Sequence, residues 1–347
     1  MSQPIVTMQR VAVRAGVHQT TVSLALRNDP RLSAATRERI QAVARELGYR
    51  PNPLVSALIA TRSRRNAAKQ AVIAYVTADD DAHRERGVEP SYRDLFSGAR
   101  ARAEELGYGL EHFWLGDPKL TRARFNQITA TRNIHGLILG PLFKQHPTLD
   151  VDWDRFSVVA YGYAIAEPHV HRVYPDFYHG MVEALRRCRA AGYKRVGTVL
   201  EEKTDLKADH LWLSAYLSEQ HLMPGNARIA PLLLSTWDAG AFARWHRRYR
   251  PQVVIGLNRI LMRINDWTRT AAGRDAENTR LVMLNITNTM ISESVTGVWI
   301  DRQRVGAACV DQVVGMMHRN EKGVPAKALH LIVENGWVDG NHFLPEI

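Results

Sequence analysis

From residue 71 onward the sequence alternates short apolar runs with longer amphipathic stretches, and no other feature restricts the possible fold as strongly. A short apolar run indicates a buried strand, whereas apolar residues spaced three and four apart indicate a helix that lies on a sheet. Strands that alternate with helices form parallel sheets covered by helices, and these strands are too many for one small Rossmann-like unit. We therefore expect an α/β core of two parallel-sheet lobes, with a ligand bound in the crevice between them at the carboxyl ends of the strands. The predicted strands are 71–76, 136–139, 157–161, 195–199, 253–256, 280–283 and 297–300, and the predicted helices include 92–106, 178–191 and 304–318.

The first fifty residues have a different pattern, which is that of an all-α unit. Thr7 and Ser33 are suitable N-caps for helices over 8–14 and 34–47, and a second helix is predicted over 18–26. A short connector that contains a glycine joins the first two helices. This spacing predicts a helix-turn-helix, whose second helix lies in the major groove of DNA. A helical hairpin with a purely structural role is the alternative.

Charge is distributed unevenly along the chain. Residues 1–65 contain eleven arginines, no lysine and three acidic residues, so +8 of the net charge of +11 lies there and only +3 in the other 282 residues. A basic head on a nearly neutral body indicates contact with a polyanion such as nucleic acid. A solvated charged face is the alternative.

The residues of the N-terminal segment resemble one known family. The pattern is Val11-Ala12-x-x-Ala15-Gly16-Val17-x-x-x-Thr21-Val22-Ser23-x-Ala25-Leu26, then Leu32-Ser33-x-x-Thr36-Arg37-x-x-Ile40, then Leu47-Gly48-Tyr49-x-Pro51-Asn52. Over this length, without a gap, it is similar to the headpiece of the lactose-repressor-like (LacI/GalR) transcriptional regulators. The match holds most of the signature positions and is highly specific.

The resemblance implies base-reading roles for Gln19, Thr20 and Leu24. Two positions depart from the family's pattern. Leu24 stands where many relatives have Arg, so bidentate recognition of a guanine is lost, and a thymine methyl contact or simple packing remains. His18 replaces the usual N-capping Ser, which weakens the start of the helix and offers a phosphate contact. The resemblance implies further phosphate contacts by Thr7, Thr21, Ser23, Arg27, Arg31, Ser33, Thr36 and Asn52.

A short apolar stretch follows the headpiece and resembles the family's hinge helix. Asn52 can cap this helix with Pro53 at its first position, where a missing N–H costs nothing. The family's hinge helices pair in the minor groove, and Leu58 matches the side chain that wedges a base step. Val55 stands where the family prefers Ala, and its larger side chain affects how closely the hinge helices can pair. An ordinary apolar linker is the alternative.

The resemblance continues, more weakly, through the core. Residues 191–197 resemble the family's step into a second-lobe strand, and Asp176 with Gly180 resembles its entry to the preceding helix. The implied fold is that of the periplasmic sugar-binding proteins, in which the chain crosses between lobes three times. The expected organisation is a headpiece over 1–50, a hinge and linker over 51–66 and a core over 67–347, with a first lobe of about 67–170 and 303–332 and a second of about 171–302 and 333–347.

The resemblance also implies a set of ligand-facing side chains, which combine planar polar groups for sugar hydroxyls with an aromatic face. Asn258 and Asn285 stand where many relatives have Asp, Trp212 fills a usual Gly, and the Arg often found near Asp209 is missing. Each residue could instead be a satisfied structural polar group or a core aromatic residue. The implied ligand is a sugar or sugar derivative, unless the site takes an unusual ligand or has lost it. The candidates are Tyr92, Asp94, His179, Asp209, Trp212, Asn258 and Asn285.

No residue pattern indicates an enzyme, a cofactor or a metal site. Cys188 and Cys309 lack metal-ligand spacing, and we expect them to be buried in a reducing cytoplasm. Phosphate loops, nucleophile elbows and His-x-x-x-His pairs are absent from the sequence. The N-terminus does not resemble a signal peptide, and no apolar run approaches the about 20 residues of a membrane helix.

The combined prediction is a cytoplasmic, homodimeric transcription factor, a repressor, that binds a pseudo-palindromic operator. A small ligand between the two lobes would change its affinity for DNA by population shift. No leucine repeat follows residues 337–340, so dimers rather than dimers of dimers are expected. Two alternatives remain: a ligand-independent DNA-binding regulator with a degenerate effector site, and a sugar-binding protein built on the same core.

Overall fold

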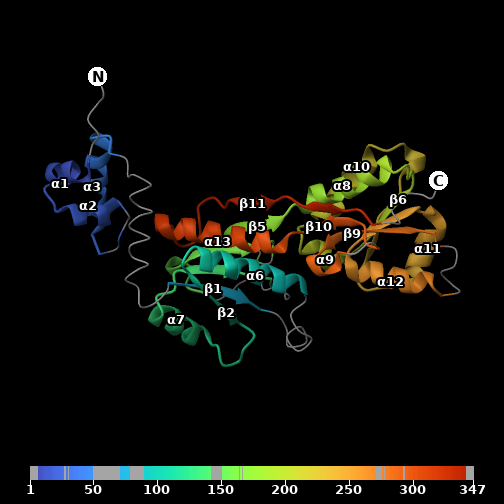
Figure 1. Cartoon of the computed structure of the whole chain (residues 1–347), viewed down its shortest axis with the longest axis horizontal. Helices are drawn as coiled ribbons and strands as arrows, with labels where there is room; N and C mark the ends of the chain where they lie inside the picture. The colour runs from blue at the N-terminus through green and yellow to red at the C-terminus, as the bar shows by residue number, and fades with distance from the viewer. Residues whose placement is uncertain are drawn as a thin grey trace, which may run out of the picture.

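The structure is a computed structural model of the chain that describes residues 7–26, 29, 31–49, 71–78, 90–141, 151–163, 165, 167–270, 276, 278–291 and 294–340. These residues form a helical headpiece, blue in Figure 1, and an α/β core with two six-stranded sheets. The fold class expected from the sequence is confirmed.

The headpiece consists of α1 (Met8–Ala15), α2 (Gln19–Leu26) and α3 (Ala34–Glu46), each packed against the other two. The Thr7 and Ser33 hydroxyls accept the N–H groups of Arg10 and Thr36, which confirms both predicted N-caps. Gly16 ends α1 with φ 63°, a left-handed conformation that suits glycine and turns the chain into α2. The small core contains Val11, Ala12, Ala15, Val22, Ala25, Ile40 and Ala44.

The first lobe is built on a sheet in which every pairing is parallel, in the order β11-β5-β4-β3-β1-β2. Helices α6 (Pro90–Glu105) and α13 (Arg302–Arg319) cover one face, and α7 (Arg122–Thr131) covers the other. The short helix η1 (Trp153–Arg155) precedes β4. The strands are β1 (Val72–Thr77), β2 (Gly109–Trp114), β3 (Gly136–Leu139), β4 (Ser157–Tyr161), β5 (His171–Pro175) and β11 (His330–Val333).

The second lobe has the corresponding order, β12-β10-β9-β8-β6-β7, with one antiparallel edge strand, β12. Helices α8 (Phe177–Ala190) and α10 (Leu211–His221) cover one face, and α11 (Ala239–Tyr249) and α12 (Asn258–Thr268) cover the other. The short helices are α9 (Glu202–Leu206), η2 (Gly225–Ala227) and η4 (Asn288–Met290). The strands are β6 (Val196–Glu201), β7 (Leu232–Leu234), β8 (Val253–Gly256), β9 (Arg280–Ile286), β10 (Gly297–Trp299) and β12 (Gly336–Val338).

The chain crosses between the two sheets from β5 to α8, from β10 to α13 and from β11 to β12. We expected the second lobe to begin near residue 171, which is wrong because β5 pairs with β4 in the first sheet. Strands β2, β5, β7, β11 and β12 were not predicted from the sequence. Four of these are the outer strands of the two sheets: β2 and β11 carry polar or exposed residues, and β7 and β12 are only three residues long.

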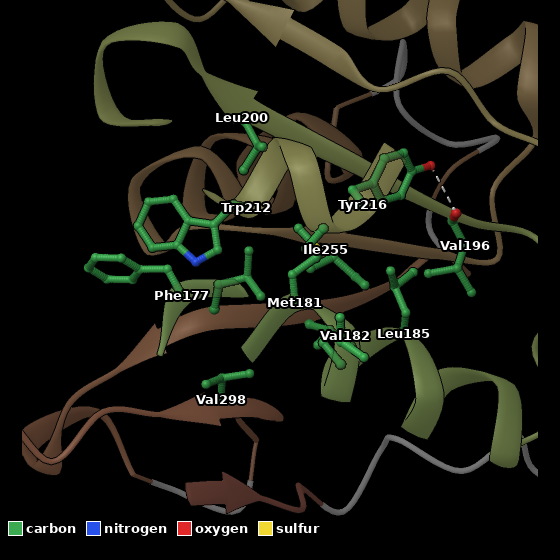
Figure 2. Packing of buried hydrophobic residues seen from close by; sticks show 14 of the residues in the cluster. Phe177, Met181, Val182, Leu185, Val196, Leu200, Trp212, Tyr216, Ile255 and Val298 are labelled. Carbon is green, nitrogen blue, oxygen red and sulfur yellow. Dashed lines mark hydrogen bonds between the residues drawn. The ribbon is translucent and has the colours of Figure 1, made fainter. Parts of the chain in front are cut away.

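The helix pairs that cover the two sheets pack differently. In the first lobe α6 and α13 approach through glycines, and a Cβ added at Gly306 would lie 2.0 Å from the Leu95 carbonyl oxygen. In the second lobe large side chains of α8 and α10 pack against each other, as Figure 2 shows for Phe177 and Trp212. None of the helices in the described part of the chain is long and apolar enough to span a bilayer.

Candidate functional site

The exposed face of α2 carries the residues predicted to read DNA bases. Gln19 and Thr20 are exposed in its first turn, and Leu24 is half-buried one turn further on. The opposite face is anchored by Val22 and Ala25, which are fully buried. Short polar side chains therefore project from the N-terminal end of the helix, where a major groove could receive them.

His18 performs the capping role that its usual serine would have. Its Nδ1 accepts the Thr20 N–H at 3.3 Å and lies 2.9 Å from the Thr20 hydroxyl. The imidazole therefore supplies an acceptor where serine is missing, and the weakening of this helix start stays a prediction.

Several basic or polar residues of the headpiece are held by the protein itself. Arg31 forms a two-bond pair with Asp29, at 2.9 and 2.8 Å. Arg37 donates to the Leu32 carbonyl and Arg39 to the Ala15 carbonyl at the end of α1. Arg31 could therefore contact a phosphate only if its guanidinium released the Asp29 carboxylate or bonded to both groups. The Asp29 carboxylate also neutralises the Arg31 charge.

The other predicted phosphate contacts lie at helix starts or along α2. Thr7 and Ser33 are exposed N-caps, and Thr36 shares a 2.8 Å hydrogen bond with Ser33. Thr21 and Ser23 are half-buried on α2. Arg27, Asn52, Val55 and Leu58 lie outside the described residues, as does the predicted hinge and linker over 51–66.

In the core, the structure brings together two of the predicted ligand residues at the carboxyl ends of β8 and β9. The Asn285 side-chain oxygen accepts the Asn258 N–H at 2.9 Å and so caps the start of α12. Tyr92 and Asp94 lie together on α6, both half-buried. His179 is exposed on α8, and its Nδ1 is 2.8 Å from the Asp176 carboxylate that caps this helix.

Asp209 lies in a turn whose geometry is set by a buried carboxylate. Asp205 is 1% exposed, lies 2.8 Å from the His210 Nδ1 and accepts the Leu213 N–H. Asp209 and His210 consequently adopt left-handed φ values of 54° and 57°. The Asp209 side chain is exposed and can interact with groups outside its own turn.

Asp209 faces a cluster of polar aromatic residues from the first sheet. The Tyr163 hydroxyl donates to Tyr174 at 3.0 Å, and Tyr174 lies 3.3 Å from the His330 Nδ1. Arg172 is buried, stacks on the Tyr163 ring and donates to two carbonyls. Burial, the hydrogen bond to Tyr174 and the Asp209 carboxylate all raise the pKa of Tyr163.

Trp212, the aromatic residue predicted to stack on a sugar, is 6% exposed within the second-lobe core. Its ring lies edge-on to Phe177 with centroids 4.8 Å apart, as Figure 2 shows. Trp212 is therefore a core aromatic residue, which is the alternative to a ligand contact given for it above.

The structure adds three polar residues that the sequence analysis missed. Tyr75 on β1, Tyr161 at the end of β4 and Arg302 at the start of α13 lie at the carboxyl edge of the first sheet. Arg302 is 8% exposed and donates to the Tyr161 hydroxyl at 3.0 Å. Burial raises the pKa of Tyr75 well above its usual value, so its phenol stays protonated. A tyrosine within an otherwise aliphatic strand was the signal that could have identified two of them.

Cys188 and Cys309 are both buried, as expected, and burial raises the pKa of each thiol to about 12. Within the described ranges, no group of three or more His, Cys, Asp or Glu residues is arranged to hold a metal ion.

Comparison with known proteins gives a consistent result for the N-terminal segment and for the chain as a whole. Residues 7–52 match the profile of the bacterial regulatory proteins of the lacI family. The regulator CelR of Thermobifida fusca is 26% identical over 198 residues, 56% of this chain and 55% of that protein. PtxS of Pseudomonas plecoglossicida is 29% identical over 197 residues, with 56% and 54% covered. The chain thus spans about half the length of these curated relatives.

Solved structures share the architecture at lower identity. The CelR–cellobiose complex aligns with a TM-score of 0.54 and 19% identity over 97% of this chain and 98% of its own. The lac repressor dimer bound to operator and the anti-inducer ONPF aligns with a TM-score of 0.50 and 15% identity over 99% and 100%. These likenesses support the fold of a headpiece joined to a two-lobed core.

Proposed function

Because the chain belongs to the lacI family of bacterial regulatory proteins, we propose that it is a sequence-specific DNA-binding repressor of transcription that acts in the cytoplasm. The observation that carries this proposal is the geometry of α2, which presents Gln19 and Thr20 in an exposed first turn while Val22 and Ala25 anchor its other face. A helix anchored in this way can enter a major groove without losing its place in the headpiece.

The proposed roles of the headpiece residues follow from their chemistry. A glutamine can form two hydrogen bonds with an adenine edge, and a threonine can contact either a base or a phosphate. The exposed caps Thr7 and Ser33 lie at helix N-termini, where backbone N–H groups favour a phosphate. These contacts would position α2, whereas Gln19 would carry sequence preference.

We also propose a homodimer on a pseudo-palindromic operator, with paired hinge segments in the minor groove and Leu58 as the wedge. The symmetry argument supports it: one headpiece reads only a few base pairs, and two headpieces at fixed spacing read two half-sites.

The effector is proposed to be a small sugar-like molecule bound between the lobes. The solved structure of the relative CelR is a complex with cellobiose, which supports this class of ligand. Asp209 in the second lobe and Tyr163 in the first are near enough for the carboxylate to raise the pKa of the Tyr163 phenol, so polar groups of both lobes are available to one ligand. A ligand that contacts both lobes would favour one relative arrangement of them and so change operator affinity.

The test is a binding titration of the full chain on DNA from the region around its own gene and on scrambled DNA, at several salt concentrations. We expect the native fragment to bind about 10³-fold or more tightly at physiological salt. Gln19→Ala should lower that specific affinity roughly tenfold and leave scrambled DNA binding unchanged. Gln9→Ala is the matched control, since Gln9 is exposed on α1.

Equal binding to both DNAs with a steep salt dependence would contradict the proposal, because that result describes a basic surface without base recognition. The same conclusion would follow if Gln9→Ala and Gln19→Ala had equal effects. Leu58→Ala should remove most of the margin between native and scrambled DNA if the wedge role is correct.

A further inference from the structure

The carboxyl edge of the first sheet contains buried hydrogen-bonding groups that no described residue satisfies. Arg302 is 8% exposed, and its Nε has no hydrogen-bond partner. Tyr75 is 3% exposed, and its hydroxyl also has none. Buried polar groups in folded proteins are nearly always paired, so two such groups at one edge require an explanation.

Tyr75 and Tyr161 lie on the same face of the sheet, on strands β1 and β4, which are separated by β3. Tyr75 pairs with Ile138 in the β1–β3 register, and Tyr161 is the last residue of β4, two positions beyond Val159. Gly140 follows β3, and a Cβ added there would lie 2.8 Å from the Tyr75 hydroxyl. The glycine therefore leaves room for the Tyr75 phenol to extend toward the carboxyl ends of the strands.

Tyr161 lies near both residues. Its hydroxyl accepts from the Arg302 guanidinium at 3.0 Å, and it belongs to the same buried cluster as Tyr75. In this arrangement the Tyr161 O–H is itself still a donor. We name Tyr75, Tyr161 and Arg302 the arginine–tyrosine cluster.

Among the described residues, the Arg302 charge has no counter-ion. Across the described part of the chain, no carboxylate lies within ion-pair distance of its guanidinium, although acidic groups are nearby in sequence. The adjacent Asp301 caps α13 by accepting the Arg304 N–H at 3.0 Å. An unpaired buried cation costs free energy. A neutral side chain could hold Tyr161 equally well, so a purely structural role does not explain why an arginine stands at position 302.

We propose that the arginine–tyrosine cluster binds the anionic group, a carboxylate or a phosphate, of the effector. The inference rests on the proposed function, because it specifies the chemical class of that regulator's ligand. A guanidinium offers a planar fork of donors that matches both kinds of anion, and two phenols can each donate one further bond. The N-terminus of α13 adds a favourable partial charge at the same place.

The position of Arg302 also links binding to the arrangement of the lobes. Arg302 begins α13, directly after the crossing from β10 in the second sheet. An anion held there contacts the segment that joins the lobes, so its binding energy can differ between their relative orientations. A ligand can shift a conformational equilibrium only by such a difference.

The experiment measures binding to the full chain by calorimetry and by thermal shift at constant ionic strength. The probes are gluconate and glucose 6-phosphate, with glucose as the neutral counterpart, and acetate and inorganic phosphate alone. We expect at least one anion to bind saturably. If the carboxylates bind, the recognised group is a carboxylate, and if the phosphates bind, it is a phosphate. Arg302→Met should weaken that anion roughly tenfold or more and leave glucose unaffected.

Arg304→Met is the matched control, since it removes the same charge from an exposed site on the same helix and should not change anion binding. Without ligand, Arg302→Met should melt no lower than Arg304→Met, because it removes an unpaired buried charge. Tyr75→Phe keeps the packing, should fold, and should weaken the anion by a smaller factor.

The proposal is wrong if no anion binds saturably, or if Arg302→Met and Tyr75→Phe bind every anion as tightly as the unaltered chain. Binding to DNA is recorded separately. Specific DNA binding without anion recognition removes this inference and keeps the proposed function, whereas anion recognition without specific DNA binding does the reverse.

Discussion

The two lobes share a strand order but differ in how they use polar groups at their carboxyl edges. In the second lobe these groups satisfy one another: Asn285 caps the start of α12, and Asp205 holds the turn before α10. In the first lobe Arg302 and Tyr75 each keep a buried group without a partner. The same topology therefore gives one edge where these polar groups are paired and one where two buried groups have no partner among the described residues.

The lobes differ equally in how their covering helices are held. Backbone contact at Gly306 brings α6 and α13 together in the first lobe, whereas aromatic side chains separate α8 and α10 in the second. A close contact between two helix backbones is disrupted when a substitution adds atoms, whereas an aromatic layer is disrupted when a substitution removes them. Larger side chains should therefore destabilise the first lobe, and smaller side chains the second.

The largest effect is expected for Trp212→Ala in the second lobe. Removing this buried indole leaves a cavity beside Phe177, and the free energy of unfolding should fall by about 3–5 kcal/mol. Urea denaturation followed by circular dichroism measures it, with Trp212→Phe as the milder control. A loss below about 1 kcal/mol would mean that Trp212 is not a core residue, and the sugar-stacking role would regain support.

Gly306→Ala should be the next most damaging change, and it acts on the first lobe. The new Cβ would lie 2.0 Å from the Leu95 carbonyl oxygen, so α6 and α13 must separate, at a cost of about 3 kcal/mol. Gly315→Ala on the same helix is the control, because its Cβ would meet only the flexible end of Arg319. The control should be neutral or up to about 1 kcal/mol stabilising. Similar losses for both would show that the close contact is unimportant.

Two tyrosine-to-phenylalanine changes compare the lobes directly. The Tyr216 hydroxyl donates to the Ile229 carbonyl at 2.8 Å and lies 3.2 Å from that of Val196, shown in Figure 2. Tyr216→Phe should lower the free energy of unfolding by about 1–3 kcal/mol, because buried acceptors lose their donor. Tyr75→Phe removes a hydroxyl without a partner and should change stability by less than about 0.5 kcal/mol. Equal effects would remove the distinction drawn between a buried hydroxyl with partners and one without.

The smallest effect is expected from acidic pH on the stability of the outer strand β11. His171 is buried and its Nδ1 accepts the Leu329 N–H at 2.8 Å, just before β11. Burial lowers the pKa of His171; nearby Glu321 opposes this shift and Arg319 adds to it. Because the folded state binds the proton less readily than the unfolded state, this contribution to stability is present above about pH 6.5 and decreases as the pH falls below it.

Amide exchange of residues 330–333 should therefore accelerate between about pH 7.5 and about pH 5.5, after correction for the intrinsic rate. His171→Gln keeps an acceptor but cannot titrate in this range, so its exchange should be less sensitive to pH. An unchanged pH dependence in this variant would assign the effect to other groups.

Much of the headpiece could be predicted because its determinants are local. The caps at Thr7 and Ser33, the glycine turn after α1 and the spacing of Val11, Val22 and Ile40 act within a few residues of the helices that they define. The alternation of strands and helices likewise predicted the two-lobed core. The capping contact of His18 could not be predicted in this way, since it becomes visible only when the position of the ring is known.

The sequence alone was sufficient for the headpiece helices, for the exposed face of α2 and for every inner strand of the two sheets except β5, because hydrophobic period and helix capping are short-range properties. Tertiary structure decided that β5 belongs to the first sheet, that Trp212 is buried, and that residues as distant as Tyr75, Tyr161 and Arg302 meet at one edge. Strand order and register create such meetings, and no periodicity along the chain encodes which distant strands become neighbours.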